Sequence, residues 1–259
     1  MATINDRLSR RPDLSTFLVH LTRDFGSTTA RDNLLSILVG EEVEARAALG
    51  MATELAGRNP AVVETQKVVC LSETPLEHVW SLCGPIDGRQ VSMSSYGLAL
   101  PKLWARSQGC NPVEYLDITP GHTWLTNSVN MLVKLAEKQG AFVLDGDENV
   151  VAVPLEDAPV LALTPFFEQM GPTRTSRKEF WWEREWRHRG NLRIDWQHVL
   201  AIFAPANDHA AFKADLLKRT TPAQAPRIDK VRLLDPLWSL ERMIAELAGL
   251  TEADVNPFA

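Results

Sequence analysis

The chain has 259 residues, of which 45% are hydrophobic and 23% charged, and its net charge is −6. This composition is typical of a folded globular protein and excludes an intrinsically disordered chain. The negative net charge argues against a general nucleic-acid coat protein, although it leaves a local basic patch open. No apolar signal segment opens the chain, and no apolar run approaches the roughly 20 residues of a membrane helix, so we expect a cytoplasmic protein that binds no membrane.

The best-marked catalytic motifs are absent from the sequence. It has no glycine-rich phosphate loop, no His-Glu-x-x-His and no Gly-x-Ser-x-Gly, which removes the corresponding kinases, metalloproteases and hydrolases. The three cysteines, Cys70, Cys83 and Cys110, lack C-x-x-C spacing, and no histidine pairs with a carboxylate at metal-ligand spacing. We therefore expect neither a disulfide framework nor a bound metal.

The first elements in chain order are a strand and a helix. Residues 17–23 predict a buried strand that contains His20, which is there either a satisfied core residue or a functional one. A helix is predicted to begin after the capping residues 27–29 and to end near Gly40. The Ala/Glu-rich residues 41–57 predict a further helix.

The middle of the chain predicts mainly strands. Residues 68–71 predict a short buried strand, and residues 91–100 an alternating strand in which Gly97 would let something approach the backbone closely. A short helix over 102–107 and a strand over 113–118 follow.

The remainder of the chain alternates irregularly between the two kinds of element. Helices are predicted over 124–138, 208–218 and 237–248, and strands over 150–153, 160–163, 199–204 and 227–234. The last helix has Leu240, Ile244 and Leu247 on one face. This order predicts the α+β class, with a polar lead-in over residues 1–15 and a single domain over residues 16–259.

Residues 180–187 contain three tryptophans and alternating acidic and basic side chains. A strand would place Glu183, Glu185 and Arg187 on one face, with the two carboxylates about 7 Å apart, where they would suit a charged or polyol ligand. A helix would instead make Glu183 and Arg187 neighbours one turn apart. The local pattern leaves both alternatives open.

The surrounding residues 174–193 are rich in arginine and tryptophan. Arginines can follow a phosphate backbone and aromatic rings can stack on bases, so the region is a candidate nucleic-acid contact. Its alternative is ordinary solvated surface.

Six blocks of the chain carry a family resemblance: Phe17–Thr22, Asn33–Leu38, Cys70–Leu76, Tyr96–Ala99, Pro112–Tyr115 and Trp182–Arg187. In their order and spacing they resemble the AbiGi-like abortive-infection proteins over most of the chain. The same blocks are similar to bacterial proteins of the ADP-ribosyltransferase superfamily, including the DarT-like toxins. The resemblance implies a domain with a split mixed or antiparallel β-sheet core of ADP-ribosyltransferase type, flanked by helices.

The resemblance also implies an enzyme that uses NAD as a substrate and no metal. Glu185 would be the catalytic carboxylate that holds the ribose 2′-hydroxyl, and Glu183 would be oriented toward the acceptor. Tyr96 would stack on the nicotinamide ring, and Ser95, which corresponds to the serine-type variant of the same strand, would help to bind NAD.

The other implied residues bind the rest of NAD. His20 would hydrogen-bond the adenosine ribose, and Thr22 would assist with the nicotinamide amide. Arg23 or Arg187 would contact the pyrophosphate.

Three functions follow from the resemblance. The first is a toxin or effector of phage defence that transfers ADP-ribose to a macromolecule, with nucleic acid slightly favoured as the acceptor. The second is a non-catalytic antitoxin or sensor that binds a partner, such as a cognate toxin. The third is NAD hydrolysis, in which water replaces the acceptor.

Overall fold

The computed structural model describes residues 11, 13–52, 60–87, 89, 91–118, 124–139, 142–144, 150–152, 159–172 and 177–250. The chain divides into two compact units. Unit 1 comprises residues 1–42, 71–107 and 193–259, and unit 2 comprises residues 43–70 and 108–192. The polar lead-in predicted for residues 1–15 lies mostly outside the described residues.

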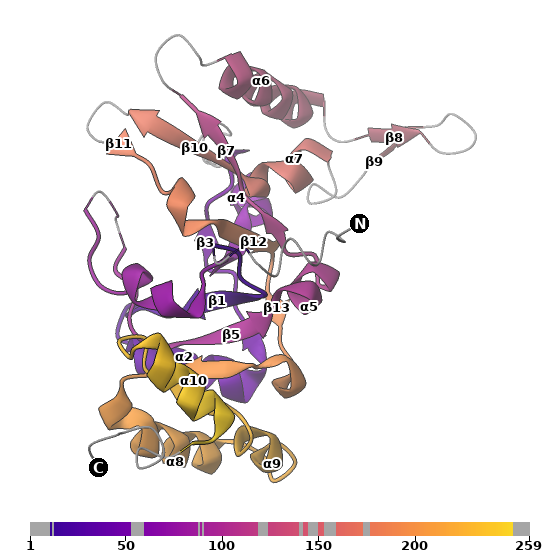
Figure 1. Cartoon of the computed structure of the whole chain (residues 1–259). Coiled ribbons are helices and arrows are strands. Elements are labelled where there is room, and N and C mark those ends of the chain that lie inside the picture. The colour runs from indigo at the N-terminus through magenta and orange to yellow at the C-terminus, as the bar shows by residue number, and fades with distance from the viewer. Residues whose placement is uncertain are drawn as a thin grey trace, which may run out of the picture. The chain divides into compact units, whose positions relative to one another are not determined.

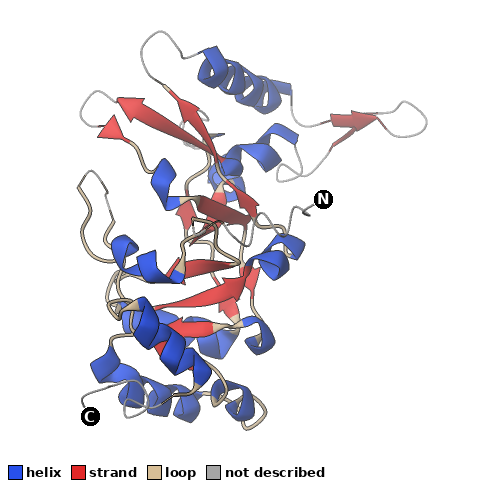
Figure 2. Cartoon of the chain, viewed as in Figure 1, coloured by secondary structure: helices blue, strands red, loops and turns tan. Residues whose placement is uncertain are grey.

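Figures 1 and 2 show the elements of the chain. In unit 1 they are β1 (Phe17–Leu21), α2 (Ala30–Gly40), η1 (Leu76–Leu82), β5 (Gly97–Pro101), α5 (Lys102–Ser107), η5 (Trp196–His198), β14 (Ala201–Phe203), η6 (Ala206–Asp208), α8 (His209–Arg219), α9 (Ala225–Ile228), β15 (Arg232–Leu234) and α10 (Leu240–Ala248). Three strands lie where the chain passes between the units, β2 (Glu42–Val43), β4 (Lys67–Ser72) and β13 (Leu192–Arg193).

The elements of unit 2 are mostly short. They are β3 (Ala47–Ala48), α4 (Pro60–Thr65), β6 (Asn111–Pro112), β7 (Glu114–Asp117), α6 (Trp124–Gln139), β8 (Phe142–Leu144), β9 (Val150–Ala152), α7 (Pro159–Leu163), η3 (Thr164–Phe166), β10 (Phe167–Pro172), β11 (Arg177–Lys178), η4 (Trp181–Glu183) and β12 (Glu185–Arg189).

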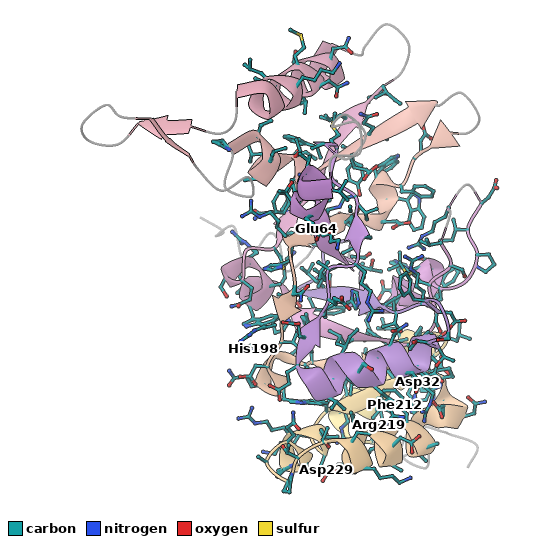
Figure 3. The ribbon with its side chains drawn as sticks, turned by 180° about the vertical axis from the view of Figure 1, so that it is seen from behind. Asp32, Glu64, His198, Phe212, Arg219 and Asp229 are labelled. Atoms are coloured by element: carbon teal, nitrogen blue, oxygen red, sulfur yellow. The ribbon has the colours of Figure 1, made fainter. Side chains whose placement is uncertain are left out.

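Unit 1 is built on a mixed sheet with the strand order β15-β14-β5-β1. β15 and β14 are parallel, whereas β14–β5 and β5–β1 are antiparallel, with Val19 opposite Ala99. α10 lies in front of this sheet in Figure 1 and α2 in front of it in Figure 3, which is turned by 180°. Helices therefore cover both faces, which is why the strands read as continuous apolar runs.

The core of unit 1 on the α10 side contains side chains from alternate strand positions. Val19, Ala99, Phe203 and Leu234 pack with Met243 of α10 and with residues of η1. Alternation along a strand sends the intervening residues to the opposite face. There Leu18, Leu98, Leu100 and Ile202 are at most 1% exposed, as are Leu34, Leu35 and Leu38 of α2.

Unit 2 contains further paired strands and has a core of its own. β12 lies between β4 and β6, and β3 pairs with β4. β7 and β10 form a parallel pair with β11 at its edge, and β8 pairs with β9. A small apolar cluster stabilises the unit, formed by Met51, Ala52, Val62, Leu116, Val129 and Leu161.

The structure confirms the predicted α+β class with a mixed sheet. The helix predicted over residues 41–57 is wrong, because β2 and β3 occupy residues 42–43 and 47–48. The strand predicted over residues 160–163 is also wrong, because these residues belong to the helix α7. A short apolar run does not distinguish a strand from a buried turn of helix.

Two other predicted strands are shorter than expected. Of residues 91–100, only those from Gly97 onward form the strand β5. Of residues 227–234, the first two belong to α9 and the strand β15 begins at Arg232. The single domain predicted for residues 16–259 stays a prediction. Among the described residues, no helix is long and apolar enough to span a membrane.

Candidate functional site

The residues implicated by the resemblance fall into two groups. His20, Thr22, Arg23, Ser95 and Tyr96 belong to unit 1, and Glu183, Glu185 and Arg187 belong to unit 2. Each group has its own network of contacts within its unit. That the two groups form one NAD site stays a prediction.

The tryptophan-rich stretch of unit 2 is neither one strand nor one helix. Its first part is the single turn η4, which ends at Arg184 in a left-handed conformation with φ of 47°. The strand β12 begins only at Glu185. Glu183 therefore lies in the turn, and Glu183 and Glu185 do not share a strand face.

Arg187 is the most buried charged side chain among the described residues, at 1% exposed. Its Nε and Nη2 donate to the two carboxylate oxygens of Glu185 at 2.9 and 3.0 Å, and Nη2 also donates to Glu168 at 2.5 Å. Nη1 donates to the Pro165 carbonyl oxygen at 2.9 Å, with longer contacts to two further carbonyls. All three guanidinium nitrogens are thus used inside unit 2.

The charges of this cluster act on one another strongly. Burial is the largest single influence on the pKa of Arg187 and would lower it, but the charges of its neighbours and the hydrogen bond to Glu185 together outweigh burial and raise that pKa. Burial, followed by the same carboxylate, raises the pKa of the Cys70 thiol well above its ordinary value. Cys70 therefore stays a protonated thiol of low reactivity.

Tyr115 fixes the start of β12. Its hydroxyl accepts a hydrogen bond from the backbone N–H of Glu185 at 3.3 Å and lies 3.5 Å from the Phe180 carbonyl oxygen. Burial raises the pKa of Tyr115 above its ordinary value. The backbone and the side chain of Glu185 are therefore both held in place.

In unit 1 the end of β1 lies beside the start of β5. The Thr22 N–H donates to the Tyr96 carbonyl oxygen at 2.8 Å, and the Thr22 hydroxyl donates to the Ala30 carbonyl oxygen at 2.8 Å. The carbonyl oxygen of His20 faces Gly97, where a Cβ atom would lie only 2.4 Å from it. Gly97 thus permits a close approach of β1, as the sequence predicted, and Thr22 anchors the start of α2.

A polar network that sequence reasoning missed surrounds Tyr96. Arg31 of α2 donates to Asp208 at 2.7 Å and to Asp215 at 2.9 Å, and the Tyr96 hydroxyl donates to Asp208 at 2.8 Å. Phe212 of α8 lies beside α2 (Figure 3), with its ring stacked on that of Tyr96 at 6.0 Å and under the Arg31 guanidinium at 5.5 Å. Both the hydroxyl and the ring of Tyr96 are therefore engaged within the fold.

An alkaline titration tests these two environments, because Tyr96 and Tyr115 are the only tyrosines of the chain. Burial, followed by the hydrogen bond to Asp208, raises the pKa of Tyr96 from 10.0 to about 12. The unfolded chain therefore binds fewer protons than the folded chain between pH 10 and 12, and stability falls as pH rises through that window. Between pH 10 and the folded-state pKa of about 12, we expect tyrosinate absorbance to appear mainly together with the loss of folded structure, and absorbance rising near pH 10 in the folded chain would contradict this.

An open pocket lies next to this network in unit 1. Its volume is about 490 Å³, and it is lined by Arg23 and Asp24 after β1 and by residues 91–94 before β5. The Ser94 N–H donates to the Thr22 carbonyl oxygen at 2.8 Å, which holds the two walls together. Of the residues implicated by the resemblance, Arg23 alone lines this pocket.

Ser95 belongs to unit 1 but does not line the pocket. Ser95 follows the pocket wall and hydrogen-bonds Cys83, whose pKa is raised to about 11 by burial in spite of that bond. Within the described ranges, no three histidine, cysteine or acidic side chains are grouped as a metal site would require.

The fold and these clusters define an α+β protein with a mixed sheet, a buried ion network in unit 2 and an open polar pocket in unit 1. A family model matches residues 49–212, more than half of the chain, and its description is "Putative abortive phage resistance protein AbiGi, antitoxin". The chain belongs to the AbiGi family, as the resemblance of its sequence blocks predicted. No curated protein and no solved structure matches the chain.

Proposed function

We propose that this chain is the antitoxin of an abortive-infection system and that it acts by binding a partner toxin. The description of its family supports this function over that of a toxin enzyme. In this proposal the fold presents a binding surface. The buried networks around Arg187 in unit 2 and Tyr96 in unit 1 stabilise the fold that presents it.

The observation that carries the proposal is the pairing of Glu185 with Arg187. Both carboxylate oxygens of Glu185 accept hydrogen bonds from a guanidinium that is 1% exposed. A carboxylate that stabilises an oxocarbenium-like ribose needs its negative charge directed at the substrate. Glu185 directs its charge at Arg187 instead, which favours a structural role.

The surroundings of two other residues also disfavour an NAD site. Arg187 has no nitrogen left for a pyrophosphate, because its donors are bound to carboxylates and backbone carbonyls. The Tyr96 ring is stacked on Phe212 and its hydroxyl is bound to Asp208, so its role against a nicotinamide ring has little support. These residues do not fit NAD, and ADP-ribosyl transfer remains the rival function.

Incubation of the full chain with labelled NAD and cell lysate distinguishes the proposed antitoxin from an ADP-ribosyltransferase. We expect neither labelled macromolecules nor free ADP-ribose from the wild-type chain or from Glu185→Gln. Label that requires Glu185 and is lost on nuclease or protease treatment would instead establish an ADP-ribosyltransferase of nucleic acid or protein. Free ADP-ribose without label would establish NAD hydrolysis.

Glu168→Gln is the matched control, because Glu168 and Glu185 both bind Arg187 while only Glu185 is a candidate catalytic residue. A structural role predicts that the two variants lose stability by similar amounts, about 1–3 kcal/mol each, measured by urea unfolding. It also predicts that both variants keep partner binding under conditions in which they remain folded. Loss of function in Glu185→Gln alone, with equal stability of the two variants, would contradict the structural role.

A further inference from the structure

The pocket of unit 1 is built from two segments that the sheet brings together. The backbone bonds between Thr22 and residues 94 and 96 fix the segment after β1 against the segment before β5. The Gly84 N–H donates to the Met93 carbonyl oxygen at 2.8 Å, which ties the end of η1 to the same wall. The pocket is therefore a fixed feature of unit 1.

Arg23 is the positively charged residue that lines this pocket. In the part of the chain that the structure describes, its guanidinium forms no ion pair and no hydrogen bond, although it lines the pocket. The neighbouring Asp24 carboxylate accepts the Ala30 N–H at 2.7 Å, at the start of α2. Since the positive end of a helix dipole stabilises a carboxylate there, Asp24 is compensated by α2, and among the described residues Arg23 has no counterion.

Two exposed aromatic side chains lie on segments that line the pocket or are hydrogen-bonded to its wall. Phe25, which directly follows Asp24, is 52% exposed, and Trp80 of η1 is 55% exposed. The Cys83 N–H donates to the Trp80 carbonyl oxygen, and Cys83 and Gly84 bridge to Met93 in the pocket wall. Arginine with exposed large aromatic side chains is the composition of protein–protein hot spots.

We propose that this pocket receives an acidic side chain of the partner protein, with apolar partner residues packed on Phe25 and Trp80. The proposal rests on the proposed function, in which the chain acts by binding a protein. Charge complementarity with Arg23 requires an aspartate or glutamate at the centre of the contact. The open shape favours a protruding side chain of a protein over a small molecule, which is usually enclosed over most of its surface.

A capped peptide, acetyl-Glu-Leu-Glu-Leu-Glu-amide, probes the site directly on the full chain. NMR signals of the Arg23 side-chain N–H and the Trp80 indole N–H are expected to shift and to saturate with a Kd on the order of 1 mM. The corresponding glutamine peptide is expected to bind about tenfold more weakly or not at all. Arg23→Glu should abolish the shift of Trp80, and Arg23→Gln should weaken it.

Arg193→Glu is the matched control, because Arg193 is 91% exposed in the same unit and is not one of the pocket-lining residues. This variant should bind the peptide as the wild-type chain does. Equal shifts with the glutamine peptide, or saturation by inorganic phosphate at the same concentration as the acidic peptide, would overturn the proposal, the latter in favour of a small-anion site.

A second experiment uses the natural partner protein, which is captured from the native host with the tagged full chain. Arg23→Glu is expected to weaken its binding about 100-fold, mainly through slower and more salt-sensitive association, and Arg193→Glu is expected to leave it unchanged. A partner that binds Arg23→Glu as tightly as wild type would overturn the pocket proposal alone. Absence of any partner, with the peptide still bound at Arg23, would overturn the proposed function alone.

Discussion

Replacing Arg187 with methionine is expected to lower the free energy of unfolding by about 3–5 kcal/mol. The substitution removes the cation that binds both Glu185 and Glu168 and leaves two carboxylates facing each other in a buried site. It also removes the donor to the Pro165 carbonyl oxygen. Loss of one partner from a buried ion network lowers the free energy of unfolding by more than the intact network adds to it, because the remaining charges stay desolvated and unpaired.

Urea unfolding at neutral pH measures this loss, with Arg193→Met as the control. Arg193 is 91% exposed and its nearest carboxylate is 3.7 Å away, so its replacement should change the stability by less than about 0.5 kcal/mol. Arg187→Lys should also destabilise, since one ammonium cannot replace the planar set of guanidinium donors. Equal stability of Arg187→Met and Arg193→Met would contradict the structural role of the cluster.

Gly97→Ala is expected to destabilise the chain by about 2–3 kcal/mol. The added Cβ would lie 2.4 Å from the His20 carbonyl oxygen and 2.7 Å from a Leu21 side-chain atom, within the paired strands β1 and β5. Both strands are in the core of unit 1, so neither can move aside without disturbing the sheet. Overpacking of this kind is relieved only by shifting backbone.

The control for this prediction is Gly40→Ala at the end of α2. A Cβ at Gly40 would meet nothing within 4 Å, and alanine is the better helix former, so this variant should be as stable as wild type or slightly more stable. Thermal unfolding of the two variants compares them directly. A Gly97→Ala variant as stable as Gly40→Ala would show that β1 and β5 are not packed this closely.

Local sequence patterns predicted a helix or strand correctly where the element has a clear hydrophobic period or a capping residue. The strand around His20, the helix that begins after Thr29 and the C-terminal helix ending at Gly249 are all present near their predicted positions. Periodicity does not say which face is covered, however. Leu240, Ile244 and Leu247 share a face of α10 as predicted, yet they are exposed, and Met243 and Ala245 are the buried residues of that helix.

The candidate site depended more on partners distant in sequence. The strand pattern of the tryptophan-rich stretch identified Glu185 and Arg187 as one group, but Glu168, 19 residues before Arg187, completes that group. Arg31 and Asp208, which hold Tyr96, are 177 residues apart. No local spacing signals such pairs, because they form only when segments far apart in the sequence pack together within each unit.

Whether the chain neutralises a toxin is measured most directly by growth. The protein captured with the full chain is expressed in the native host lacking both genes, alone and together with wild-type chain or Glu185→Gln. We expect the captured protein alone to stop growth, and both the wild-type chain and Glu185→Gln to restore it. Growth arrest by this chain itself, abolished by Glu185→Gln and not by Glu168→Gln, would contradict the antitoxin function and establish the chain as the toxin.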